Sequence, residues 1–237
     1  MSGPGASDDA PARLLVFYGG TFDPVHDGHL AIARAARDAL ATTIRLMPAA
    51  DPPHRAPPGA SAAQRAEMLE LAIAGEPGLC VDRRELDRAG PSYSIDTLRA
   101  LRAEFGQDAP IALLVGADSF AILPSWHAWR GLFELAHFVV ADRQGSPLDH
   151  GLPAELHEAL AGRWREAPEA LLRSPAGCVL RLRQPLHGES ATAIRERIAD
   201  GLPWRDQVPP AVAAYIGRHG LYLNSGGDEG ADTPAPL

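Results

Sequence analysis

Short apolar runs alternate with longer segments rich in alanine and leucine along most of the chain. Runs such as LLVF and IALLVG have no alternating polar positions, which is typical of strands buried on both faces of a parallel sheet. We expect strands at 13–18, 43–47, 79–82, 111–116, 137–142 and 179–183, and helices at 28–41, 61–74, 94–105, 129–135, 191–199 and 210–218. Strands that alternate with helices predict right-handed βαβ units, so the fold class is α/β, with a Rossmann-like doubly wound parallel sheet.

Three stretches interrupt this alternation. Residues 143–176 are rich in proline, glycine, histidine and glutamate, and we interpret them as an insertion on a single domain that spans 13–223. Within the insertion, 153–165 is predicted to form a surface helix. The terminal stretches 1–12 and 224–237 have little apolar content to bury, so we expect both tails to be disordered.

The composition fits one globular domain and narrows the available chemistry. Of 237 residues, 46% are hydrophobic and 22% are charged, which is typical of neither disordered nor fibrous chains. All 22 basic residues are arginines. The chain therefore has no lysine, and it can form neither a Schiff base nor a P-loop lysine contact. Any contacts to phosphate must come from arginine, histidine and backbone N–H groups. The net charge of −8 argues against a sequence-independent nucleic-acid binder, which needs a basic face.

Cysteine usage and hydropathy give expectations about metal binding and location. Cys80 and Cys178 are isolated in apolar runs, so we expect neither a disulfide framework nor a zinc site. The first residues lack a signal-peptide pattern, and no apolar run reaches the ~18 residues that cross a bilayer. We therefore expect a cytoplasmic protein without membrane contact.

A glycine-rich turn, GGTFDPVHDGHL at 19–30, follows the first predicted strand. In an open α/β sheet the first strand–helix turn is the usual phosphate site, and Gly19 and Gly20 allow their N–H groups to face an anion. His26 and His29 are three positions apart at a helix start, so both imidazoles can lie on one side of it. The helix N-terminus also favours an anion. We interpret this turn as a phosphate-binding site.

A second turn, SATAIRERI at 190–198, begins the helix predicted at 191–199. Ser190 is a good N-cap residue. Arg195 lies in the first or second turn, where the helix dipole does not favour a cation unless an anion is bound at the same helix start. Arg195 is therefore a candidate phosphate ligand.

These two motifs resemble those of the H-x-G-H nucleotidyltransferase superfamily, and the form GGTFDP is similar to that of bacterial nicotinate-nucleotide adenylyltransferases. The resemblance implies a nucleotidyltransferase-type fold. It also implies adenylyl transfer from ATP to nicotinate mononucleotide, giving nicotinic acid adenine dinucleotide and pyrophosphate in NAD biosynthesis, with Mg²⁺ carried by ATP and no protein metal site. The implied catalytic residues are His26, His29 and Arg195, and the implied ATP site adds Gly19, Gly20, Thr21, Phe22, Ser190 and Thr192.

Further strings between the two motifs follow the family's order and supply a candidate nicotinate-nucleotide site. The resemblance places a tryptophan, here Trp126, against the pyridine ring, where flat stacking suits a π system. Asp118 at a strand end is suited to accept hydrogen bonds from ribose hydroxyls, and Ser94 at a helix start can offer backbone N–H groups to a carboxylate. The full candidate set is Gly20, Thr21, His54, Arg55, Tyr93, Ser94, Asp118 and Trp126.

Some residues receive a plainer interpretation. Glu189 stands where the family commonly has an apolar residue, and we expect its carboxylate to point away from bound triphosphate. Gln144 departs from the family's R-P-G, which leaves a role for Arg143 open. We interpret the charged run 83–88, which includes Glu85, as a solvated loop. The histidines at 127, 137, 150, 157, 187 and 219 are interpreted as structural or surface residues.

The implied reaction needs no general base, because the attacking phosphate oxygen is already ionised at neutral pH. The protein must align the reactants and neutralise charge on the α- and β-phosphates. Three alternatives stay open: an adenylyltransferase that uses nicotinamide mononucleotide or both mononucleotides, a non-catalytic nucleotide-binding regulator, and an added protein or RNA partner at 143–176. A homo-oligomer is also open.

Overall fold

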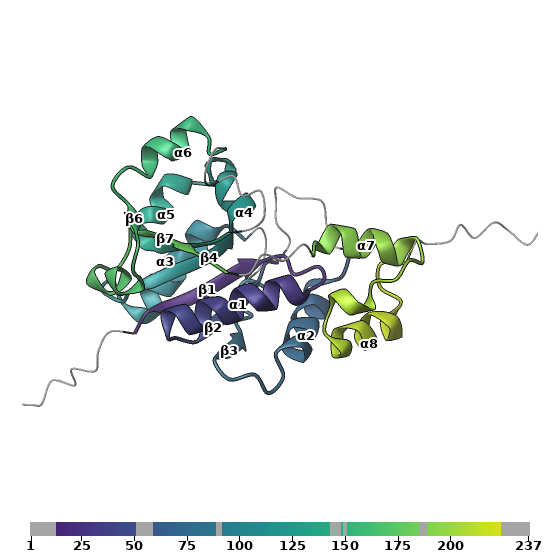
Figure 1. Ribbon diagram of the computed structural model, residues 1–237. Helices are drawn as coiled ribbons and strands as arrows, with labels where there is room; N and C mark the ends of the chain where they lie inside the picture. The colour runs from purple at the N-terminus through teal and green to yellow at the C-terminus, as the bar shows by residue number, and fades with distance from the viewer. Residues whose placement is uncertain are drawn as a thin grey trace, which may run out of the picture.

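The computed structural model describes residues 13–50, 59–88, 92–142, 148, 151–184 and 189–223. Within these residues, seven parallel strands form one sheet in the order β3-β2-β1-β4-β5-β7-β6 (Figure 1). The strands are β1 (Leu15–Gly20), β2 (Ile44–Pro48), β3 (Leu79–Val81), β4 (Ile111–Gly116), β5 (His137–Ala141), β6 (Trp164–Arg165) and β7 (Val179–Leu182). The parallel α/β sheet predicted from the apolar runs is confirmed.

Helices follow most of the strands. They are α1 (Asp27–Leu40), α2 (Ala62–Ala72), α3 (Ser94–Phe105), α4 (Ala117–Ala121), α5 (Trp129–Leu135), α6 (Ala154–Ala159), α7 (Ala191–Ala199) and α8 (Pro210–His219), with 3₁₀ turns at Leu123–Ser125, Pro168–Arg173 and Arg205–Gln207. The start of α2 is set by a capping box, in which Ser61 and Gln64 exchange backbone-to-side-chain hydrogen bonds of 3.3 and 2.9 Å. Gly220, in the left-handed region at φ 59°, ends α8.

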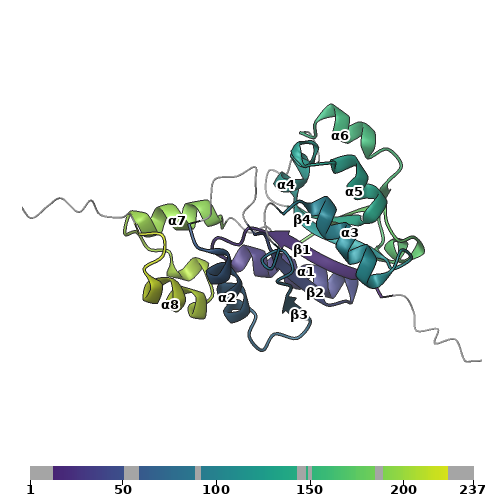
Figure 2. The same cartoon turned by 180° about the vertical axis from the view of Figure 1, so that it is seen from behind.

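Successive residues of β1 face opposite sides of the sheet, and this builds two apolar cores. Val16 and Tyr18 pack in one core with α1, α2, α7 and α8, whereas Phe17 packs in the other with α3, α5 and α6. Helix α1 therefore lies in front of the sheet in Figure 1, and α3 lies in front when the molecule is seen from behind in Figure 2. The strand order reverses between β1 and β4, and crevices at such a point are the usual ligand sites of doubly wound folds.

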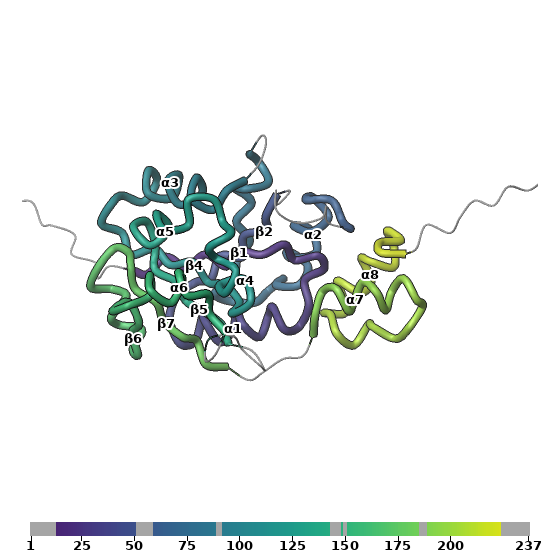
Figure 3. The backbone as a smooth tube through the Cα atoms, turned by 90° about the horizontal axis from the view of Figure 1, so that it is seen from above, coloured from purple at the N-terminus to yellow at the C-terminus, as the bar shows by residue number. Residues whose placement is uncertain are grey.

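Helices α7 and α8 lie together at one end of the molecule, beyond α2, as the view from above in Figure 3 shows. Tyr215 of α8 donates a hydrogen bond of 2.6 Å from its hydroxyl to Glu67 of α2. This C-terminal helical pair therefore joins the sheet through the helix that follows β2.

The interpretation of 143–176 needs one correction. The helix predicted at 153–165 is wrong in its extent, because α6 ends at Ala159 and Trp164–Arg165 pairs with β7 as the edge strand of the main sheet. Gly162, at φ 72°, lies between the two elements, in a conformation that a helix cannot continue. The predicted tails lie outside the described residues, so their disorder stays a prediction, and residues 143–147 of the insertion also lie outside them. None of the described helices has the length and apolar character of a bilayer span.

Candidate active site

The turn after β1 is folded around the ring of Phe22. Phe22 is buried at φ 52°, and its ring contacts Tyr18 and His29 edge-on at centroid distances of 5.4 and 5.0 Å. A Cβ at Gly20 would lie 2.9 Å from this ring, so only glycine fits beneath it. Phe22 therefore shapes the turn from inside, directly after Gly20, which still pairs with Pro48 in the β1–β2 ladder.

His26 and His29 lie one above the other at the start of α1. Their ring centroids are 3.8 Å apart with an interplanar angle of 32°. The backbone N–H of His26 donates to Nδ1 of His29 at 3.3 Å, so neutral His29 carries its proton on Nε2, as a donor. Burial, and then the neighbouring His26, lower the pKa of His29 well below its usual value. At neutral pH this position offers an N–H group with no added charge.

Arg195 reaches the same turn from α7. Its Nη1 donates to the backbone carbonyl of Asp23 at 2.6 Å and lies 3.7 Å from Oδ2 of that carboxylate. Its Nη2 donates to Oγ1 of Thr192 at 3.3 Å, while the hydroxyl of Ser190 accepts from the N–H of Ala193 at 3.3 Å and caps the helix. The structure thus brings the second predicted motif to the first.

Asp23 holds this junction together, and the sequence analysis did not single it out. Its side chain is 4% exposed. Oδ2 accepts from the N–H of Gly59 at 2.8 Å, and Oδ1 accepts from the N–H of Ala60 at 3.1 Å and from the hydroxyl of Tyr222 at 2.8 Å. One carboxylate therefore joins the first turn, the segment before α2 and the residues after α8.

Arg65 of α2 is a second residue that the pattern did not reveal. Its side chain is fully buried, and its guanidinium donates to the carbonyls of Thr21 and Ala50 at 2.7 and 2.8 Å. These carbonyls belong to the segments that follow β1 and β2. A buried cation beneath the first turn both fixes that turn and adds positive potential where an anion is expected.

The expectation for Glu189 is wrong. Its Oε2 lies 3.5 Å from the position of a Cβ built on Gly28, which is itself 3.1 Å from the His26 ring. The carboxylate therefore turns toward the start of α1 rather than away from it. Residues 185–188, which precede Glu189, lie outside the described residues.

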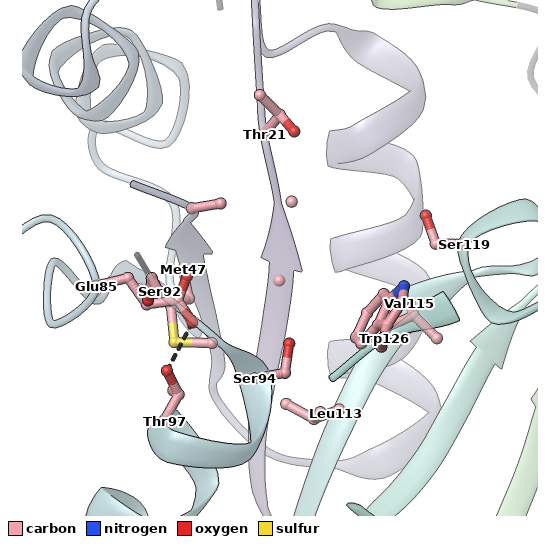
Figure 4. A pocket seen from close by; sticks show the side chains of 13 residues that line it. Thr21, Met47, Glu85, Ser92, Ser94, Thr97, Leu113, Val115, Ser119 and Trp126 are labelled. Carbon is pink, nitrogen blue, oxygen red and sulfur yellow. Dashed lines mark hydrogen bonds between the residues drawn. The ribbon is translucent and has the colours of Figure 1, made fainter. Parts of the chain in front are cut away.

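A pocket opens beside the first turn, on the α3 side of the sheet, and is called here the β1–β4 pocket (Figure 4). Of the residues predicted to bind nucleotide, Gly19, Gly20, Thr21, Ser94 and Trp126 line it. The remaining lining residues, which the sequence analysis did not assign to binding, are Met47, Ala49, Glu85, Ser92, Thr97, Leu113, Val115 and Ser119. In Figure 4, Trp126 and Ser119 face Glu85, Ser92 and Thr97 across the ends of β1 and β4.

The other predicted nucleotide-site residues lie around this pocket. Tyr93 is the N-cap of α3 and its ring contacts that of His127 at 4.7 Å. Asp118 is exposed in the first turn of α4, next to the lining residue Ser119. His54 and Arg55 lie outside the described residues.

The solvated-loop interpretation of the charged run 83–88 is wrong at Glu85. Glu85 is 6% exposed, and its Oε1 accepts a hydrogen bond of 2.8 Å from the hydroxyl of Thr97. Nη1 of Arg88 donates at 3.0 Å to the hydroxyl oxygens of both Thr97 and Ser92. Burial raises the pKa of the Glu85 carboxyl. The loop is held against α3 because this carboxylate has buried partners, which a run of charges in sequence does not disclose.

His137 fits the structural interpretation given to it. Its side chain is 0% exposed, its Nε2 lies 2.9 Å from the carbonyl of Ser174, and its Nδ1 accepts from the N–H of Cys178 at 3.0 Å. These two partners fix the neutral ring, and burial lowers the pKa of His137.

Comparisons with known proteins agree with this architecture. Residues 17–197 match the model of the cytidylyltransferase-like family. The chain is 61% identical over 214 residues to a Stenotrophomonas maltophilia (strain K279a) protein called "Probable nicotinate-nucleotide adenylyltransferase", with 88% of this chain and 96% of the relative covered. A Xylella fastidiosa (strain M12) protein of the same name is 47% identical over 213 residues, with the same coverage.

Among solved structures, the Plasmodium falciparum nicotinic acid mononucleotide adenylyltransferase complexed with NaAD superposes with a TM-score of 0.65. The superposition covers 89% of this chain and 97% of that one, at 15% sequence identity. At this low sequence identity, the superposition shows a shared fold.

Proposed function

The chain belongs to the cytidylyltransferase-like family, and on that premise we propose that it transfers the adenylyl group of ATP to nicotinate mononucleotide. The products are nicotinic acid adenine dinucleotide and pyrophosphate, in NAD biosynthesis. One observation carries the proposal: Thr21 lines the β1–β4 pocket and belongs to the same turn as His26 and His29, which lie at the start of α1. An anion site and a pocket with an aromatic side chain therefore share the carboxyl end of β1, where a triphosphate and a pyridine nucleotide can meet.

The triphosphate is held by donors from both motifs. Nε2–H of His29, the Arg195 guanidinium and backbone N–H groups of the first turn donate to phosphate oxygens, and the start of α1 adds its dipole. In this role Arg195 lies in the second turn of α7, with its charge balanced by phosphate as well as by Asp23. These groups are placed before the reaction begins, so they stabilise developing charge without reorganising.

The chemistry is an in-line displacement at phosphorus. A phosphate oxygen of nicotinate mononucleotide forms a bond to the α-phosphorus of ATP, and the bond between that phosphorus and the oxygen bridging to the β-phosphorus breaks. The electron pair of the broken bond leaves with pyrophosphate. The attacking oxygen is already ionised, so the protein aligns the two substrates and neutralises charge, and no side chain needs to remove a proton.

Magnesium enters as part of the substrate MgATP. The first turn brings together imidazoles and a guanidinium, which suit phosphate oxygens, and the Asp23 carboxylate there already accepts from Gly59, Ala60 and Tyr222. Among the described residues, no cluster of three or more metal-ligating side chains gathers to hold an ion. The metal supplies charge neutralisation between phosphate oxygens and is held by those oxygens.

The pyridine ring occupies the β1–β4 pocket. Trp126 stacks on the ring, and the N–H groups in the first turn of α3, at Ser94 and Ile95, receive its carboxylate with support from the helix dipole. Asp118, next to the pocket, accepts from ribose hydroxyls. Tyr93 contributes through the helix start rather than as a lining residue.

The reaction is tested by pyrophosphate release from MgATP, with nicotinate mononucleotide and nicotinamide mononucleotide assayed in parallel and CTP as the alternative donor. We expect release with ATP and the acid form to be at least ~10-fold faster than with the amide. Equal use of both mononucleotides would indicate a dual-specificity enzyme. ATP binding by calorimetry without release from either acceptor would overturn the proposal in favour of a regulatory nucleotide-binding protein.

A further inference from the structure

The β1–β4 pocket contains a buried acidic side chain for which adenylyl transfer has no evident use. Glu85 lines the pocket together with Ser94, whose helix start receives the substrate carboxylate in the proposed function. A carboxylate here repels an anionic ring substituent and attracts an amide NH₂ group. Taken alone, Glu85 would therefore favour the wrong mononucleotide.

Arg88 compensates this charge through two hydroxyl groups. One guanidinium nitrogen, Nη1, lies 3.0 Å from the oxygens of both Ser92 and Thr97. Because the Thr97 oxygen accepts from Arg88, its own hydrogen is directed to Oε1 of Glu85, 2.8 Å away. Both hydroxyl groups belong to lining residues, so the compensated carboxylate forms one side of the pocket.

The neighbouring charges do not supply another partner. Burial raises the pKa of Glu85, whereas Thr97, Arg88 and Ser92 act in the opposite direction and Asp82 raises it further. Asp82 is itself paired with Arg84, whose Nε lies 2.9 Å from both carboxylate oxygens. Among the charged side chains that act on Glu85 here, Arg88 is the cation.

We propose that Arg88 is a specificity-determining residue: by balancing Glu85 through the hydroxyls of Ser92 and Thr97, it allows the pocket to prefer a pyridine ring with a carboxylate over one with an amide. The inference rests on the proposed function and goes beyond it, since Arg88 neither lines the pocket nor touches the reacting atoms. A purely structural Arg88 would instead support both mononucleotides equally, by tying its loop to α3.

The test is the ratio of kcat/KM for nicotinate mononucleotide to kcat/KM for nicotinamide mononucleotide, measured at the same pH for every variant. Arg88→Met leaves the buried carboxylate without its cation, and we expect the ratio to fall by ~10-fold or more. Glu85→Gln combined with Arg88→Met removes both charges, and we expect the ratio to return to within ~3-fold of the unsubstituted enzyme. Arg83→Met is the matched control, because Arg83 is in the same run and its side chain is 44% exposed.

A uniform loss for both substrates in Arg88→Met, or a double variant whose ratio stays low, would overturn the inference. If a thermal melt shows that Arg88→Met does not fold, Thr97→Val is used instead, because it removes the hydroxyl that joins Arg88 to Glu85. Thr97→Ser retains that hydroxyl. We then expect the ratio to fall in the valine variant and to be kept in the serine variant, and equal ratios would count against the inference. The unsubstituted enzyme separates the two proposals. If it uses neither mononucleotide, the proposed function fails. If it prefers the acid form and the variants keep the same ratio of kcat/KM, only the role of Arg88 is contradicted.

Discussion

The hydroxyl of Tyr222 donates a hydrogen bond of 2.8 Å to Oδ1 of Asp23, across 199 positions of sequence. Tyr222 has a left-handed backbone, φ 64°, which a tyrosine adopts only when its surroundings hold it there. Burial, and then the carboxylate of Asp23, raise the pKa of Tyr222, so its hydroxyl stays a donor. Since Asp23 also binds Arg195, the residues after α8 help to position a candidate ligand of the proposed phosphate site.

Tyr222→Phe removes this hydroxyl and leaves the ring in place. Asp23 then loses a buried donor, and we expect the free energy of unfolding to fall by ~1–2 kcal/mol and kcat/KM for ATP to fall by ~10-fold. Denaturant titration and steady-state kinetics measure the two effects. Tyr215→Phe is the control, because it removes another hydroxyl bonded to a carboxylate in the C-terminal helical pair, away from Asp23. Equal losses of kcat/KM in both variants would mean that Tyr222 has no particular connection to the phosphate site.

His29→Ala removes a preorganised N–H donor. We expect kcat to fall by ~10²-fold or more while the thermal melting curve stays that of a folded protein. His157→Ala provides the comparison, since His157 is an exposed histidine of α6. Turnover within a few-fold of the unsubstituted enzyme would remove His29 from the catalytic set.

Arg65→Met takes away the buried guanidinium that joins the segments after β1 and β2. Two partly buried carbonyl acceptors lose a charged donor, so we expect a loss of ~2–4 kcal/mol in the free energy of unfolding. Arg65→Lys should recover only part of it, because a single ammonium group cannot reproduce the planar fork of arginine that spans both carbonyls. Chemical denaturation of both variants beside Arg99→Met, an exposed arginine on α3, makes the comparison. A lysine variant as stable as the unsubstituted protein would show that the fork is not required.

Two histidines make stability depend on pH. The folded-state pKa values of His29 and His137 are lowered, so the unfolded chain binds more protons than the folded one once the pH falls below about 6.5, the usual histidine value. The free energy of unfolding should therefore fall between pH 7 and pH 5, by up to ~1.4 kcal/mol per pH unit for each group. Urea titrations across this range test the sign, and His137→Gln should reduce the slope. Stability that stays flat, or rises on acidification, would contradict the assignment.

The sequence predicted structural features that are encoded within one segment. It did not predict side-chain roles that depend on contacts between distant segments. Continuous apolar runs predicted the parallel strands, because burial on both faces leaves a pattern in a single segment. Arg65 carries no such signal: it stands in the helical string SAAQRAEMLEL, where one arginine looks like a surface residue until α2 packs against the first turn. Glu85 was misjudged for the same reason, since its partner Thr97 belongs to another element. The two-residue strand β6 is too short to show any period.

The contact between Arg195 and Asp23 also joins a residue that is made early in synthesis to one that is made late. The ribosome adds Asp23 172 positions before Arg195, and Tyr222 follows later still. A prematurely terminated chain that ends before Arg195 can therefore contain His26 and His29, yet lack Arg195 and Tyr222, which both contact Asp23. Catalytic competence is therefore acquired near the end of translation. Fragments that end between β7 and Arg195 are expected to be inactive.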